Sequence, residues 1–94
     1  MQFLMARSLA GHDKGKVYVV LSDSGGLLSL ADGRLRTLDR PKNKKMIHVQ
    51  MIKNIPPEVA SITDGTESWE DHIIRKVIKE YSRLNGSDQI KSDA

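Results

Sequence analysis

The side chains of this protein that could do chemistry are mainly basic, and they gather in two stretches of its first half. Residues 34–45 carry six positive charges and one acid, Asp39, and residues 11–16 carry Lys14 and Lys16 among glycines. Cations that converge on one surface neutralise phosphates and release counterions, so the pattern predicts a site for a polyanion. A solvated, functionless loop is the alternative, and it is the usual explanation of a single run of charge.

The charge is distributed unevenly along the 94 residues. Through Lys53 there are ten Arg and Lys residues against four Asp residues, a formal charge of +6. From Asn54 onward five basic residues meet eight acidic ones, a formal charge of −3. The asymmetry predicts that only the first part meets an anionic partner. A chain of this length has room for one small core, and without cysteine it has no disulfide or thiolate metal site to stabilise it.

The loop at residues 8–16 leads directly into the apolar run at residues 17–21. Gly11 and Gly15 can adopt backbone angles that are costly for other residues, so they predict a tight, exposed loop around His12, Asp13 and Lys14. The segment Gly-His-Asp-Lys-Gly-Lys at residues 11–16 resembles the glycine-rich core of the KOW motif of ribosomal proteins and transcription elongation factors. The resemblance implies an RNA-binding domain with an SH3-like barrel.

The resemblance extends over about residues 3–50. Residues 31–38, 41–45 and 48–49 are similar to small bacterial KOW proteins whose nearest relatives are large-subunit ribosomal proteins of archaea and eukaryotes. Many KOW motifs carry a further glycine where this chain has Tyr18, and the ribosomal branch lacks it as well. The resemblance implies contact with structured RNA and no catalytic pocket.

Short apolar segments between turn residues predict five strands around one core. The first two begin at Phe3 and Val17, and the second is expected to be partly buried on both faces. The expected strands cover residues 3–9, 17–21, 27–30, 34–38 and 46–52. Five short strands with little helix match the mainly β, SH3-like barrel that the resemblance implies.

The second half of the predicted barrel consists of a hairpin, a basic loop and a closing strand. Asp32-Gly33 predicts a two-residue hairpin whose outgoing strand places Arg34 and Arg36 on one face. Residues 39–45 are expected to be a basic loop, because Pro41 donates no ladder hydrogen bond and the charges have no dry place to go. The strand at 46–52, with its apolar residues alternating from Ile47, is expected to close the barrel.

The second half predicts one long element, a helix that the KOW motif does not include. An apolar stripe at helical spacing runs from Trp69 to Leu84, Ser68 and Asp71 have the spacing of a capping box, and Asn85-Gly86 ends the pattern. A lone helix of this length is marginal in water, so its stripe must bury against the barrel, a second copy or another protein. The expected organisation is a barrel at 1–53, a linker or single turn at 54–66, the helix at 67–86 and a disordered tail at 87–94.

The leading hypothesis is a non-catalytic, cytoplasmic protein that binds RNA, above all ribosomal RNA, in a ribosome-associated or translation-related role. The proposed contacts come from the glycine loop, the strand at 34–38, the basic loop and the strand after it: His12, Lys14, Lys16, Arg34, Arg36, Arg40, Lys42, Lys44, Lys45 and His48. The four aromatic residues are few, and three fall on predicted core or helix positions. Folded RNA recognised through shape and phosphates therefore fits better than stacked single strands.

Catalysis finds no support in the residues. No nucleophile stands beside a base, no phosphate-binding GxxxxGKS or GxGxxG occurs, and three scattered histidines without cysteine do not make a zinc site. No cofactor or metal is expected, and His72 is expected to face solvent. The N-terminal residues match neither a signal peptide nor a membrane span.

A protein-interaction module is the competing hypothesis. SH3-like barrels also bind proteins, and the helix stripe from Trp69 to Leu84 could dock on a partner or pair two chains. Such a module is expected to expose aromatic residues along a groove, whereas this chain offers lysine and arginine.

Overall fold

Five antiparallel strands form the larger layer of the structure. The computed structural model describes residues 1–85. The strands are β1 (Met5–Ser8), β2 (Val17–Ser24), β3 (Leu27–Ala31), β4 (Lys42–Lys45) and β5 (Val49–Ile52). They lie in the order β4-β3-β2-β1-β5. The prediction of a mainly β fold with five strands is confirmed.

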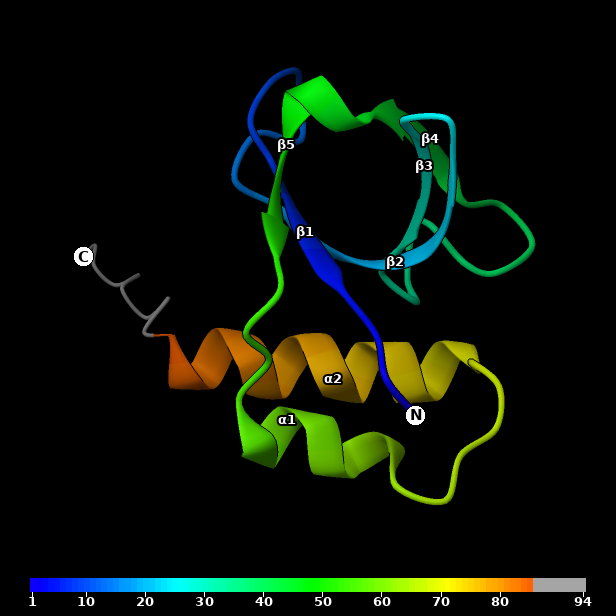
Figure 1. Ribbon diagram of the computed structural model, residues 1–94, viewed down its shortest axis with the longest axis vertical. Helices are drawn as coiled ribbons and strands as arrows, with labels where there is room; N and C mark the ends of the chain where they lie inside the picture. The colour runs from blue at the N-terminus through cyan, green and yellow to red at the C-terminus, as the bar shows by residue number, and fades with distance from the viewer. Residues whose placement is uncertain (86–94) are drawn as a thin grey trace.

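The sheet curls strongly but does not close into a barrel. β4 and β5 are its two edges, and the 3-10 turn η1 (Met46–His48) carries the chain from one edge to the other (Figure 1). Two backbone hydrogen bonds fix this crossing: Met46 N–H donates to the Gly26 carbonyl at 2.7 Å, and Leu9 N–H donates to the His48 carbonyl at 2.8 Å. The predicted strand at 46–52 is wrong in its first half, where Ile47 is 79% exposed.

The predicted hairpin at Asp32-Gly33 is also wrong. The Asp32 carboxylate accepts the backbone N–H groups of Arg34 at 2.8 Å and Arg36 at 2.9 Å, and Asp32 N–H donates to the Arg36 carbonyl. An aspartate side chain that binds the backbone in this way favours a loop over a strand ladder. Residues 32–41 therefore form a loop, and Arg34 does not lie on a strand.

The predicted basic loop contains a strand instead. Residues 42–45 form β4, which pairs with β3 so that Leu28 lies opposite Lys44 and Leu30 opposite Lys42. Pro41 lies just before the strand, where its missing N–H breaks no ladder bond. Lysines suit an edge strand, because charged side chains on an edge discourage pairing with another sheet. Their buried ends find a counterion, described below.

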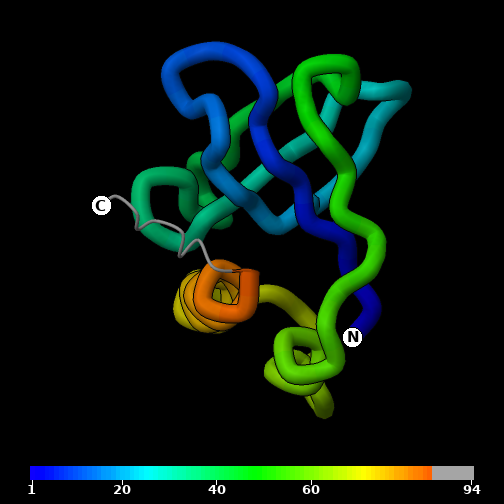
Figure 2. Tube along the Cα trace, turned by 90° about the vertical axis from the view of Figure 1, so that its left-hand side faces the viewer, coloured from blue at the N-terminus to red at the C-terminus, as the bar shows by residue number. Residues whose placement is uncertain are grey.

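Three helical segments follow the sheet: α1 (Pro57–Ala60), the 3-10 turn η2 (Ser61–Thr63) and α2 (Asp71–Leu84). The segment predicted as a linker or a single turn thus contains α1 and η2. Val59 and Thr63 are fully buried there, and Thr63 Oγ1 donates to the Met1 carbonyl at 3.0 Å. The N-terminus is held beside these turns, as Figure 2 shows. None of the helices in residues 1–85 has the length and apolarity to cross a bilayer.

The predicted capping box of α2 is wrong. Glu70 is the N-cap, and its side chain makes no capping bond. The Asp71 carboxylate instead accepts Leu38 N–H at 2.9 Å, which ties the start of α2 to the loop at 32–41. The helix ends at Leu84 with Asn85 as its C-cap. Gly86 and the predicted tail at 87–94 lie outside the described residues.

The strand alternation gives the sheet two apolar faces. Inside the curl, Tyr18, Leu28 and Leu30 are buried, and Ala6 and Val49 join them. The other face carries four buried residues, Met5, Val17, Val19 and Ala31. Partial burial of the second strand on both faces was predicted and is confirmed.

The apolar stripe of α2 packs on the outer face of the sheet. Figure 2 shows α2 beside the curled sheet. Ile74 and Val77 are fully buried against the sheet and Tyr81 nearly so, whereas His72 on the opposite side is exposed, as predicted. Each fully buried side chain of this size contributes about 1.5–3 kcal/mol. The helix is therefore part of the core of the described fold, and its stripe is not free for a partner.

Gly33 lies close against the first turns of α2. Its φ is +79°, and a Cβ atom placed there would lie 2.5 Å from the Asp71 carbonyl oxygen and 2.8 Å from Arg75 Cγ. Only a residue without a side chain fits this contact.

We expect Gly33→Ala to lower the free energy of unfolding by about 2 kcal/mol or more, because it adds a backbone clash to the cost of positive φ. Gly65→Ala is the matched control: Gly65 has φ +77° but nothing within 4 Å of the added Cβ, so it should cost only about 1–2 kcal/mol. Urea denaturation of both variants measures the difference. Equal losses would show that the contact with α2 imposes no steric limit.

Candidate functional site

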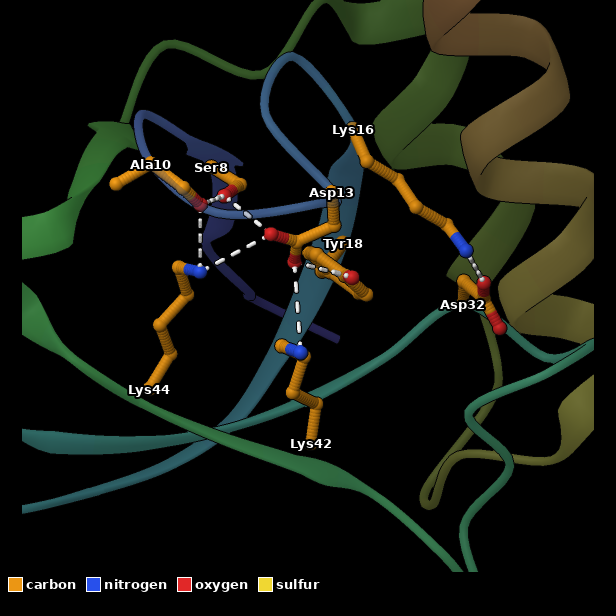
Figure 3. A network of polar contacts seen from close by, with 8 residues as sticks. All are labelled: Ser8, Ala10, Asp13, Lys16, Tyr18, Asp32, Lys42 and Lys44. Atoms are coloured by element: carbon orange, nitrogen blue, oxygen red, sulfur yellow. Dashed lines mark hydrogen bonds and ion pairs between the residues drawn. The ribbon is translucent and has the colours of Figure 1, made fainter.

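The carboxylate of Asp13 is the centre of the glycine loop, residues 9–16. It accepts hydrogen bonds from the Ser8 hydroxyl at 2.8 Å, the Tyr18 hydroxyl at 2.7 Å and Lys44 Nζ at 3.0 Å (Figure 3). Lys42 Nζ lies 3.9 Å from the same carboxylate, and Lys44 Nζ also donates to the Ala10 carbonyl at 2.9 Å. Asp13 thus joins the glycine loop, β2 and the edge strand β4.

The environment of Asp13 keeps it charged. Desolvation raises the pKa of its carboxyl, but the hydrogen bonds from Tyr18, Lys44 and Ser8 and the charge of Lys44 outweigh this, so the pKa lies far below its ordinary value. Burial raises the pKa of the Tyr18 hydroxyl well above its ordinary value, and the bond to Asp13 raises it further. The tyrosine therefore remains a proton donor to a permanent carboxylate.

The register of β4 decides which lysines meet Asp13. Directly opposite residues of paired strands share a face, so Lys42 and Lys44 lie on the face of Leu30 and Leu28, inside the curl. Lys45, one residue on, is exposed. Lys42 and Lys44 therefore close the polar end of the inner core, and the structure ties both to Asp13.

Asp32 makes a second ionic junction, next to the glycine loop. Lys16 Nζ lies 2.5 Å from its carboxylate, which is 6% exposed, and also lies over the Tyr18 ring at 5.5 Å from the ring centroid (Figure 3). Desolvation raises the pKa of the Asp32 carboxyl, but the bonds from Lys16 and from the N–H groups of Arg34 and Arg36 lower it overall. Lys16 thus fixes the loop at 32–41 beside the glycine loop.

The ten predicted contact residues fall into distinct groups. Three lysines are held by carboxylates: Lys16, Lys42 and Lys44. Six residues are exposed, on the glycine loop, the loop at 32–41, the end of β4 and η1: His12, Lys14, Arg34, Arg40, Lys45 and His48. Arg36 is half-buried beside Asp32. The sequence located the basic region, and the structure separates its structural lysines from its exposed cations.

A cleft between the sheet and α2 contains basic residues that the sequence reasoning missed. It measures about 750 Å³, and Lys16 and Arg34 line it together with Arg7, Arg75 and Lys79. Arg75 and Lys79 are four residues apart on a helix, a spacing that places them on one side. That spacing was a readable signal, but the acidic balance of the second half obscured it.

The described residues contain no group of three His, Cys, Asp or Glu side chains arranged to hold a metal ion. Two of the carboxylates with lowered pKa, Asp13 and Asp32, are saturated by the contacts described above. The site therefore offers positive charge on loops that Asp13 and Asp32 hold in place.

No protein-family model and no curated protein matches this chain.

Asp13→Asn should lower the free energy of unfolding by about 3 kcal/mol or more, because Lys44, 11% exposed, loses its counterion. Asp23→Asn is the matched control: Asp23 is exposed and accepts Gly26 N–H, a bond that asparagine can keep, so the change should be within about 0.5 kcal/mol. Urea denaturation at pH 7 compares them. Equal stability of the two variants would contradict the role given to Asp13.

The pH dependence of stability should report the same carboxylate. Because its folded pKa lies below the ordinary 3.8, Asp13 stabilises the fold above about pH 4, and this contribution is lost as pH falls through the folded pKa. The stability difference between the wild-type protein and Asp13→Asn should therefore shrink as pH falls below about 4. A difference that stays constant down to pH 2 would show that Asp13 does not have its lowered pKa.

Proposed function

We propose that this chain is a non-catalytic RNA-binding protein, that its curled sheet is an SH3-like domain of the KOW type, and that it acts in the cytoplasm on folded ribosomal RNA. The observation that carries the proposal is the glycine loop itself. The Asp13 carboxylate fixes the loop by the hydrogen bonds that it accepts from Ser8 and Tyr18, while His12 and Lys14 remain exposed on the loop. Two of the residues that carry the KOW resemblance, His12 and Lys14, are thus presented outward.

A fixed basic loop suits the recognition of a folded phosphate backbone. Its cations release counterions when they meet phosphates, and pre-ordering lowers the entropy lost on binding. Exposed cations on neighbouring segments, Arg34, Arg40 and Lys45, extend the charge beyond the loop. The aromatic residues support shape recognition over base stacking, because Tyr18 and Tyr81 are buried and Phe3 packs edge-to-face on Trp69 at 5.1 Å.

The competing hypothesis of a protein-interaction module now depends on a different surface. The stripe of α2 packs on the sheet, but Leu27, Met46 and Ile47 are exposed around a shallow pocket at the crossing between the sheet edges. Exposed apolar residues that lie together favour contact with a protein. Substitutions there should leave RNA binding unchanged under the leading proposal.

The experiment is fluorescence anisotropy of the full chain with labelled structured ribosomal RNA and with duplex DNA of equal length, at several salt concentrations. We expect submicromolar binding that prefers RNA and weakens steeply with salt. The double variant His12→Ala/Lys14→Ala should weaken RNA binding by about tenfold and flatten the salt dependence. Lys53→Ala, an exposed lysine outside the site, is the control and should bind within about twofold of wild type.

Equal and feeble binding of the wild-type protein to RNA and DNA would contradict the proposed function. Strong RNA binding that the loop variant does not weaken would contradict the assignment of the loop.

A further inference from the structure

The charged side chains that line the cleft beside α2 are nearly all positive. Five cationic side chains from four segments line it, against one acid, Asp32. Arg7 comes from β1, Lys16 from the end of the glycine loop, Arg34 from the loop at 32–41, and Arg75 and Lys79 from α2. Apolar walls of Val17, Leu35 and Ile78 lie between them.

Most of this charge is not neutralised by the protein. Lys16 is paired with Asp32. Arg7 and Arg75 each donate to a backbone carbonyl, of Gly15 at 3.2 Å and of Gly33 at 2.7 Å. A bond to a neutral carbonyl orients a guanidinium without cancelling its charge, and it leaves other N–H donors of the five on each group for an anion.

We propose that this cleft is the groove in which the phosphodiester backbone of a bound RNA lies, so that α2, which is outside the KOW resemblance, supplies one wall of the binding site. The inference rests on the proposed function. Gly15 and Lys16 line the cleft, so the glycine loop that carries the exposed Lys14 borders it. Five cations spread over four segments fit a chain of phosphates better than a single anion.

The acids of α2 do not oppose this assignment. Asp71 is turned to Leu38 N–H, and Glu80 is bound by Arg83, whose Nε donates to it at 3.0 Å. Neither residue lines the cleft. Both acids of α2 therefore lie outside the cleft. Arg75 and Lys79 join the positive surface of the first half.

The test is charge reversal on one helix at two positions. Lys79→Glu places a negative charge in the cleft, whereas Lys76→Glu makes the same change at an exposed position of α2 that does not line it. With the structured RNA probe, we expect Lys79→Glu to weaken binding about tenfold or more and to reduce its salt dependence, and Lys76→Glu to stay within about threefold. Lys79→Gln, which only removes the charge, should fall between them, and thermal midpoints check folding.

Each outcome separates the two proposals. If wild-type protein binds RNA and the glycine-loop variant weakens it, but Lys79→Glu equals Lys76→Glu, the cleft assignment is wrong and the proposed function stands. If wild-type protein shows no preference for RNA, the proposed function fails first. A further control adds inorganic phosphate at about 10 mM while the ionic strength is held constant, on the order of physiological salt. The phosphate should not displace the RNA. Displacement would assign the cleft to free phosphate and contradict its role as a groove for the RNA backbone.

Discussion

The ionic contact between Asp13 and the lysines of β4 is the constraint on which the described fold most depends. The sheet has two unpaired edges, and no ladder joins β4 to β5 within residues 1–85. Lys44 spans from the edge strand to the glycine loop, where it binds both Asp13 and the Ala10 carbonyl. Side chains thus hold together a curl that backbone pairing leaves open. Because both charges are largely buried, the pair is costly to break from either side.

The same contact explains why the glycine loop can serve as a binding surface. Asp13 points inward and takes hydrogen bonds from Ser8 and Tyr18, so the flanking residues His12 and Lys14 are left facing solvent. At this end of the inner core, the Asp13 carboxylate accepts hydrogen bonds from Ser8, Tyr18 and Lys44. A loop fixed in this way loses little entropy when it meets a rigid partner such as folded RNA.

A second junction joins the sheet layer to α2 and shapes the cleft. The Asp32 carboxylate holds the loop at 32–41 by accepting backbone N–H groups of that loop and by pairing with Lys16. Gly33 lets the loop approach the helix, and the Asp71 carboxylate accepts Leu38 N–H. These contacts place Arg34 in the lining of the same cleft as Arg75 and Lys79. The helix therefore has two roles in one position: its apolar stripe completes the core, and its basic side completes a charged surface.

The sequence by itself determined the mainly β character, the exposed glycine loop and the amphipathic helix, since glycine conformations, strand alternation and helical spacing are local properties. It also located the basic region. Only the tertiary structure decided that residues 42–45 pair as an edge strand and that Lys16 pairs with Asp32, whose carboxylate holds a loop where a hairpin was predicted. The run of basic residues did not reveal that Lys44 binds Asp13, because the two residues are 31 positions apart in the chain. The same limit hid the contribution of Arg75 and Lys79, since their partners across the cleft belong to distant segments. Which cations are bound by carboxylates and which face solvent is a property of the assembled fold.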